Sequence, residues 1–245
     1  MTEPSPSISQ APTTSNNRLA EVRAYLRALG AVLWKDIAAE LRSRELVGAM
    51  LVFGFLVILI FNFALSLDVR TRGTVTAGVL WVTFAFSGTL GLNRSMAIEK
   101  DRGCLDGLLL APVDRSAIYF GKVLGNLLFM LIVEALVIPL YAVLYNVNLF
   151  LPELALVILL GSIGYAVVGT LLSSMAVQAR TRDILLPILL FPVVLPVLIA
   201  AVNASKGILQ GFERSEIMVW LNILIVYDII FTAVGFMAFD YVVEE

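Results

Sequence analysis

The sequence predicts an all-α membrane protein with six transmembrane helices, and two observations favour this fold class. Of the 245 residues, 60% are apolar, and the mean hydropathy is +0.93, whereas about half of the residues of a soluble domain are apolar. The apolar segments are also about 20 residues long, as a helix needs to cross about 30 Å of hydrocarbon. Because the short alternating strands of a membrane β-barrel are absent from the sequence, we expect one permease-like domain over residues 46–245.

The region before the first span contains two parts. Residues 1–17 are rich in Ser, Thr and Pro and lack the apolar core of a signal peptide, so we expect a disordered cytoplasmic tail. Residues 18–45 repeat apolar side chains every three or four positions, with basic side chains mostly on the other faces. Tyr25 and Trp34 suit the headgroup region, and the basic residues can reach anionic membrane lipids. This pattern predicts an amphipathic interfacial helix, although a helix that packs on the protein itself would show the same pattern.

The spans follow in order along the rest of the chain. They are predicted at residues 46–65, 74–92, 117–145, 154–177, 184–202 and 217–239. Residues 67–73 and 203–216 are interpreted as loops because they are polar. The fourth span contains Gly161, Gly164 and Gly169, which allow another helix to approach closely.

Lysine and arginine are unevenly divided between the two sides of this arrangement. The tail and first helix contain six, residues 93–122 five and residues 178–183 two, whereas the three opposite loops contain two, none and two. Cytoplasmic segments near spans are enriched in these residues. We therefore expect both termini and residues 93–122 in the cytoplasm.

Residues 93–116 form a charged segment between the second and third spans. Residues 95–101 can continue the preceding helix, Gly103 can break it, and Pro112 can end a short helix between them. The apolar face of that short helix would consist of Cys104, Leu105, Leu108 and Leu109. Asp114 is well placed to cap the third span. The segment therefore predicts a cytoplasmic coupling helix that contacts a partner.

Residues 99–126, EKDRGCLDGLLLAPVDRSAIYFGKVLGN, resemble the CcmB family. In the family pattern an acid and a glycine precede a Leu-rich turn, which a proline and a Gly-Lys pair follow. The matching residues are Glu99, Gly103, Leu108, Leu109, Pro112, Gly121 and Lys122. The resemblance extends from about Trp34 to the C-terminus through the six-span layout and the proline series of the fifth span.

The resemblance implies the membrane subunit of a bacterial ABC complex of the ABC-2 type, in the inner membrane, that handles haem during cytochrome c maturation. ATP would be hydrolysed by a CcmA-like ATPase, and haem would be moved across the membrane or released with a CcmE-like chaperone. The implied assembly contains a homodimer of this chain with CcmC-like and CcmD-like proteins. The residues expected at the ATPase contact are Glu99, Asp101, Gly103, Leu105, Asp106, Leu108, Leu109 and Pro112.

The sequence favours a subunit that is not itself an enzyme. It contains one cysteine and no histidine, residues on which metal, haem and nucleophilic sites usually depend. Residues 116–123 differ from a phosphate-binding loop because Ser116 replaces its first Gly and Val123 its magnesium-binding Ser or Thr. Lys122 is instead interpreted as an anchor at the cytoplasmic end of the third span. We expect no cofactor or metal bound by this chain, and no nucleic-acid partner.

Glu134 and Asp228 lie inside predicted spans, where an ionised carboxylate costs about 2.5 kcal/mol or more. Neither has an obvious basic partner, so they either line a polar route, bind a partner's polar group, or hold helices together as protonated carboxyl groups. Pro187, Pro192 and Pro196 remove three amide donors from the fifth span and predict a kink, which can serve as a gate or as a fixed bend.

Two other functions remain open from the residues. One is an ABC-2 permease of the same architecture for another lipid or drug. The other is a proton-coupled carrier that uses Glu134 and Asp228. A neighbouring ATPase gene would favour either permease, and an isolated gene with proton-dependent uptake would favour the carrier.

Overall fold

The structure is a computed structural model that describes residues 14–64, 69–101, 114–177 and 181–242. In these ranges the chain forms helices and no strand, which confirms the predicted fold class. The helices are α1 (Thr14–Ser43), α2 (Glu45–Ala64), α3 (Val69–Asp101), α5 (Arg115–Tyr145), α6 (Pro152–Ala176), α7 (Arg182–Gln210) and α8 (Arg214–Val242). Six of them, α2 to α8, are long and apolar enough to cross a membrane.

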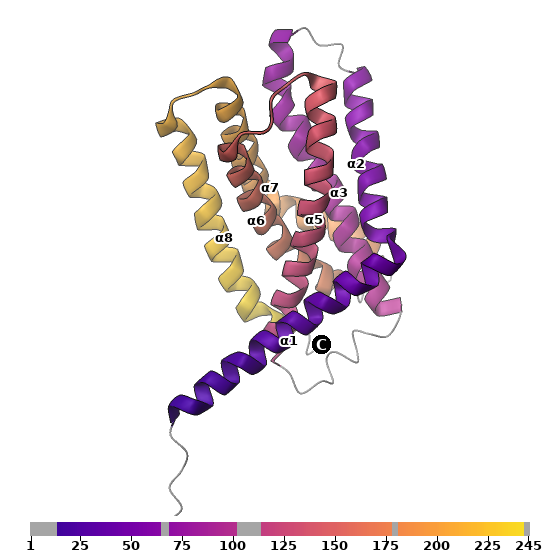
Figure 1. Cartoon of the computed structure of the whole chain (residues 1–245), viewed down its shortest axis with the longest axis vertical. Coiled ribbons are helices and arrows are strands. Elements are labelled where there is room, and N and C mark those ends of the chain that lie inside the picture. The colour runs from indigo at the N-terminus through magenta and orange to yellow at the C-terminus, as the bar shows by residue number, and fades with distance from the viewer. Residues whose placement is uncertain (1–13, 65–68, 102–113, 178–180, 243–245) are drawn as a thin grey trace, which may run out of the picture.

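The six apolar helices form a bundle, and α1 lies obliquely across one end of it (Figure 1). In the most apolar segments of α3 and α6, 72% of the residues are buried, whereas the corresponding value for α8 is 17%. The helices α3 and α6 therefore form the centre of the bundle, and α8 lies at its edge. The C-terminal end of α3 and the N-terminal end of α5 lie at the same end as α1.

The glycines of α6 explain how the central helices approach each other. A Cβ atom built on Gly161 would overlap the ring of Trp81, and one on Gly169 would overlap the side chain of Leu92, both of α3. The Trp81 indole also donates a hydrogen bond of 2.9 Å to Ser205 Oγ of α7. The predicted role of these glycines in close helix packing is confirmed.

The junction between α1 and α2 is a single residue, Arg44, with a positive φ of 53°. The carboxylate of Glu40 accepts hydrogen bonds from the backbone amides of Leu46 (3.2 Å) and Val47 (2.9 Å). These amides lie in the first turn of α2, where they have no partner within the helix. Glu40 therefore caps α2 from the preceding helix and fixes the turn between them.

Two predicted loops are partly helical. The helix α3 begins at Val69, inside the loop expected at residues 67–73, and it continues to Asp101 as the sequence allowed. The helix α7 continues to Gln210, so the loop prediction for residues 203–216 was wrong over most of its length. The polar residues of this segment were taken as a sign of a loop, but a helix accommodates polar side chains where they have hydrogen-bond partners. The helix ends at Gly211, whose φ of +71° suits glycine.

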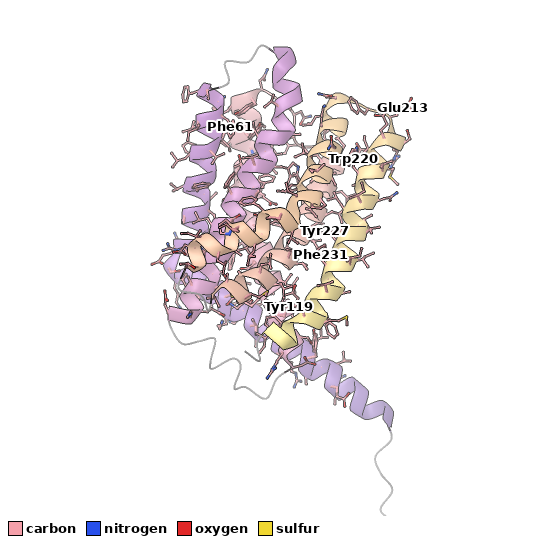
Figure 2. The ribbon with its side chains drawn as sticks, turned by 180° about the vertical axis from the view of Figure 1, so that it is seen from behind. Phe61, Tyr119, Glu213, Trp220, Tyr227 and Phe231 are labelled. Carbon is pink, nitrogen blue, oxygen red and sulfur yellow. The ribbon has the colours of Figure 1, made fainter. Side chains whose placement is uncertain are left out.

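The three prolines of the fifth span, Pro187, Pro192 and Pro196, all lie inside α7. Figure 2 shows that α7, in light orange, runs obliquely in its first half and then turns along the bundle. The Tyr227 hydroxyl of α8 donates a hydrogen bond of 2.9 Å to the backbone oxygen of Val193, between the last two prolines. The helix thus bends where amide donors are missing. A gating role for this bend remains a prediction.

Candidate functional site

The structure describes part of the predicted ATPase contact. Glu99 and Asp101 lie in the last turn of α3. Outside the described residues lie Gly103, Cys104, Leu105, Asp106, Leu108, Leu109 and Pro112, so the coupling helix remains a prediction. After this segment, Asp114 accepts a hydrogen bond of 2.9 Å from the backbone amide of Ser116 and caps α5, as predicted.

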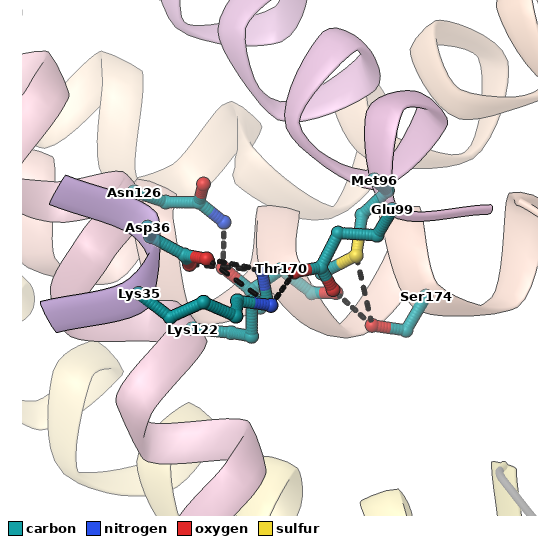
Figure 3. Close-up of polar contacts among 8 residues, drawn as sticks. All are labelled: Lys35, Asp36, Met96, Glu99, Lys122, Asn126, Thr170 and Ser174. Carbon is teal, nitrogen blue, oxygen red and sulfur yellow. Dashed lines mark hydrogen bonds and ion pairs between the residues drawn. The ribbon is translucent and has the colours of Figure 1, made fainter. Parts of the chain in front are cut away.

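Four charged side chains meet where α1, α3 and α5 converge, and we call them the four-charge cluster: Lys35, Asp36, Glu99 and Lys122 (Figure 3). The Lys122 ammonium group donates to both oxygens of Asp36, at 3.0 Å and 2.8 Å. Glu99 Oε1 accepts from both Lys35 and Lys122. Lys35 also pairs with Asp36 at 3.4 Å. The cluster joins three helices and has no formal net charge.

The cluster is largely shielded from water. The side chains of Lys122 and Glu99 are 4% and 7% exposed, whereas that of Lys35 is 37% exposed. Burial alone would lower the pKa of Lys35, but the negative charges of Glu99 and Asp36 outweigh it and raise that pKa above its ordinary value. Among the described residues, no partner donates to Glu99 Oε2. Removing one partner of a buried ion pair leaves an unpaired charge and costs about 3–5 kcal/mol.

Two glycines bring α1 close enough to α5 for these contacts. A Cβ atom built on Gly121 would lie 2.8 Å from Val32 Cβ, and one on Gly125 would lie 3.2 Å from Asp36 Oδ2. Because the two glycines are four residues apart, they occupy one face of α5. Val32 is correspondingly buried. In the Gly-Lys pair at residues 121–122, the glycine therefore allows α1 to pack closely against α5, and the lysine holds α1 there through its bonds to Asp36.

The sequence reading of these residues needs correction. Lys122 was expected to anchor α5 at the membrane surface, but its side chain points into the cluster. Glu99 was expected at a polar rim facing the ATPase, whereas it is 6% exposed and bonded to two lysines of its own chain. The position of Asp36 gave a usable signal, because it falls on the same helical face as Leu29 and Val32. An acid on that apolar face required a basic partner.

Further polar contacts hold the last turns of α3. They join Arg94 to Glu45 of α2 (2.9 Å), Asn93 to Asp183 of α7 (2.9 Å), and Lys100 to the backbone oxygen of Val177 after α6 (2.6 Å). The end of α3 is thus bonded to α2, to α7 and to the residue that follows α6.

The two intramembrane acids lie at separate places. Glu134 of α5 is 3% exposed, and Ser162 Oγ of α6 donates to its Oε1 at 2.7 Å. Asp228 of α8 is 8% exposed and lies against Gly164 of α6. Residues 162 and 164 face nearly opposite sides of a helix, so the acids flank α6 and do not form a pair. In the described ranges, neither acid has a basic partner, and both Asp228 oxygens and Glu134 Oε2 lack a donor. In the same ranges, no group of three His, Cys, Asp or Glu side chains is arranged to hold a metal ion.

Comparison with known proteins gives consistent matches over most of the chain. The model of the family described as CcmB protein matches residues 27–244. "Heme exporter protein B" of Pseudomonas aeruginosa is 28% identical over 172 residues, 70% of this chain and 77% of that relative. The proteins of the same name from Rhodobacter capsulatus and Paracoccus denitrificans are 29% and 27% identical and are covered to 88% each, over 79% and 78% of this chain. The chain belongs to the CcmB protein family.

Proposed function

We propose that this chain is the transmembrane subunit of an ABC complex that handles haem in cytochrome c maturation. The observation that carries the proposal is the family match over residues 27–244, together with relatives named heme exporter protein B. Six helices long and apolar enough to span a membrane support it. The chain itself catalyses no reaction.

ATP hydrolysis takes place in a CcmA-like partner that contacts residues 101–112. Asp101, Leu105, Asp106, Leu108 and Leu109 provide this contact, with the leucines in an apolar groove of the ATPase and the two acids at its rim. The four-charge cluster supports this assignment, because it fastens the helix that leads into the segment, α3, to α1 and α5. Movement of the ATPase would therefore displace three helices together.

The proposed orientation places both termini and the four-charge cluster on the cytoplasmic side of the bacterial inner membrane. The distribution of lysine and arginine supports it, with thirteen residues on that side and four on the other. In this orientation α1 lies in the membrane interface. Its face toward α5 is fastened by the cluster, and a second face exposes Val22, Leu26, Trp34 and Leu41 to lipid.

Haem is the substrate of the complex, and the chain acts on it indirectly. The chain has no histidine, the proximal ligand of haem iron in globins and peroxidases, and only one cysteine. ATP is therefore used to release a haem-loaded CcmE-like chaperone, with CcmC-like and CcmD-like proteins holding haem nearby. The chain acts as a homodimer with two ATPase subunits.

Complementation tests the proposal. The chain is expressed with its CcmA-like ATPase in a bacterium whose own CcmB-family gene is deleted, and covalently haem-stained cytochrome c is measured. We expect cytochrome c to be restored, and to be lost again when the ATPase carries an inactive nucleotide site. An ATPase that co-purifies without any restoration would favour a permease for another lipid or drug, and a chain that binds no ATPase would contradict the proposal.

A further inference from the structure

A pocket with charged and apolar walls lies beside the four-charge cluster, and we call it the head pocket. Its volume is about 160 Å³, and α1, α2, α3 and α5 all contribute to its lining. Its lining residues on α1 include Lys35, Ala39 and Ser43, which share one face because they are four residues apart; Ala39 and Ser43 are exposed. Leu46 of α2 and Phe129 of α5, by contrast, are 5% and 6% exposed. The head pocket therefore has its mouth along α1 and an apolar floor.

The charges of the head pocket favour a ligand that carries both signs. An anion alone would lie near three carboxylates of the lining, and a cation alone would lie near two ammonium groups. Such like-charge contacts oppose binding. A zwitterionic group brings one charge of each sign and can place each beside its opposite. The charged lining residues are Lys35, Lys122, Asp36, Glu40 and Glu99.

Two of these charged side chains retain hydrogen-bonding capacity at the mouth. The Lys35 ammonium group has three N–H donors, and its contacts with Glu99 and Asp36 use two of them. The Lys35 side chain is also 37% exposed. The half-buried Glu40 carboxylate accepts from two backbone amides of α2, but a carboxylate has about four lone-pair sites. Lys35 can therefore donate to a phosphate, and Glu40 can accept from an ammonium group.

A second hollow lies between α2 and α5, and we call it the chain groove. Its volume is about 350 Å³, and all of its described lining residues are leucine, valine or phenylalanine. They include Val52 and Leu56 of α2, which are 62% and 50% exposed, and Leu136 of α5, which is 55% exposed. The groove is therefore open to the hydrocarbon of the membrane and suits an acyl chain.

The head pocket and the chain groove follow one another along α5. Lys122 and Phe129 of the pocket and Leu136 of the groove are seven residues apart, so they lie on one face of the helix. Between Phe129 and Leu140, α5 rises about 16 Å, close to half of the roughly 30 Å of hydrocarbon. Figure 1 shows that α2 and α5 both begin at the end of the bundle where α1 lies. The two hollows thus match the length and polarity of one phospholipid of a single leaflet.

We propose that the head pocket and the chain groove together bind one phospholipid with an ethanolamine headgroup, from the leaflet on the side of α1. Its phosphate accepts a hydrogen bond from Lys35. Its ammonium group donates to Glu40 and to the hydroxyl oxygen of Ser43, whose own proton goes to a backbone oxygen. One acyl chain lies along the chain groove over Leu136. This lipid joins α1 to α2 and α5, and the inference goes beyond haem handling and does not depend on it.

Native mass spectrometry of the full chain, purified in detergent and freed of lipid, tests the proposal. The protein is titrated with phospholipids that share the same acyl chains and carry ethanolamine, choline or glycerol headgroups. We expect one ethanolamine lipid per chain, bound at least about tenfold more tightly than the choline lipid, whose ammonium group has no N–H donor, and than the glycerol lipid, which has no cation. Equal binding of the three lipids would overturn the inference. Displacement of the lipid by free phosphoethanolamine, which has no chains, would show a site for the headgroup alone and would also overturn it.

Two substitutions obstruct the site without removing a charge. Ala39→Trp fills the mouth of the head pocket, and Val52→Trp covers the chain groove. The matched controls lie outside both hollows: Ala31→Trp on an exposed part of α1, and Val219→Trp on α8, where Val219 is 57% exposed. We expect Ala39→Trp and Val52→Trp to weaken binding of the ethanolamine lipid about tenfold and both controls to bind it normally.

A site variant that binds the lipid as its control does would contradict the proposal. Loss of the ATPase from Ala39→Trp with unchanged lipid binding would assign the head pocket to a side chain of the ATPase, and would overturn the inference as well. Melting temperatures without added lipid show whether each variant is folded. The comparison of headgroups uses the wild-type chain, so it decides the question even where a variant fails to fold.

Discussion

At the scale of single residues, Lys122 is central to the packing of α1, α3 and α5. Its buried ammonium group bonds to Asp36 of α1 and Glu99 of α3, so one side chain of α5 links three helices. Lys35 is the other donor in the four-charge cluster, so the carboxylates of Asp36 and Glu99 depend strongly on Lys122.

Lys122→Met should therefore destabilise the protein by about 3–5 kcal/mol, since it leaves acids buried without their main partner. The double variant Lys122→Met with Asp36→Leu should recover part of this loss, because it removes one of the stranded charges. Thermal unfolding in detergent checks both. Lys206→Met is the control, because Lys206 is half-buried in α7 and forms no ion pair among the described residues; an equal effect there would contradict the account.

The raised pKa of Lys35 predicts a pH dependence in the alkaline range. A group whose pKa is higher in the folded state stabilises that state fully below its ordinary pKa of 10.5 and loses the contribution as pH rises through the higher folded value. Wild-type stability should therefore fall above about pH 10 more steeply than that of Lys35→Arg, whose guanidinium group stays charged. Melting temperatures of both proteins from pH 8 to 12 test this, and parallel curves would contradict it.

At the scale of elements, features that depend on residues close in the sequence were predicted well, whereas pairings between residues far apart in the sequence were not. Asp114 was recognised as a cap because its acceptor and the amide of Ser116 are two residues apart. The pairing of Asp36 with Lys122 spans 86 residues and depends on how α1 crosses α5, which no local pattern contains. The end of α7 was misplaced because polar residues were taken as a loop signal, although Ser205 bonds to Trp81 inside the bundle.

The contact between α1 and α5 gives a prediction at this scale. Gly121→Leu should displace α1, because even a Cβ atom at this position meets Val32 at 2.8 Å, and overpacking of this kind costs about 1–3 kcal/mol. Limited proteolysis of α1 in membrane vesicles should become faster. At the control position, Gly78, a Cβ atom meets nothing within 4 Å, so unchanged proteolysis is expected for Gly78→Ala; similar behaviour of the two variants would argue against close packing.

At the scale of the whole molecule, the hydropathy pattern was sufficient for six candidate spans, because membrane insertion depends mainly on length and composition. The end of the bundle that carries α1 also carries the charged end of α3. One surface therefore gathers the N-terminal helix, the four-charge cluster and the start of the segment expected to meet the ATPase.

The predicted topology is tested with cysteine labels in a Cys104→Ser background. Phe212, between α7 and α8, and Arg42, near the end of α1, are exposed and belong to opposite ends of the bundle. A membrane-impermeant thiol reagent should label Phe212→Cys from the periplasmic side of intact cells and Arg42→Cys only after lysis. The reverse pattern would invert the proposed orientation.

The central claim is that the segment after α3 transmits ATP hydrolysis by a partner to haem handling. The most direct measurement is the amount of CcmA-like ATPase that co-purifies with Leu109→Asp, together with haem-stained cytochrome c in the same cells. Truncating or charging a buried anchor typically costs about 2 kcal/mol or more, so we predict that ATPase retention falls at least about tenfold and cytochrome c is lost, while protein level and melting temperature stay unchanged. Normal ATPase retention and normal cytochrome c in the Leu109→Asp variant would contradict the account.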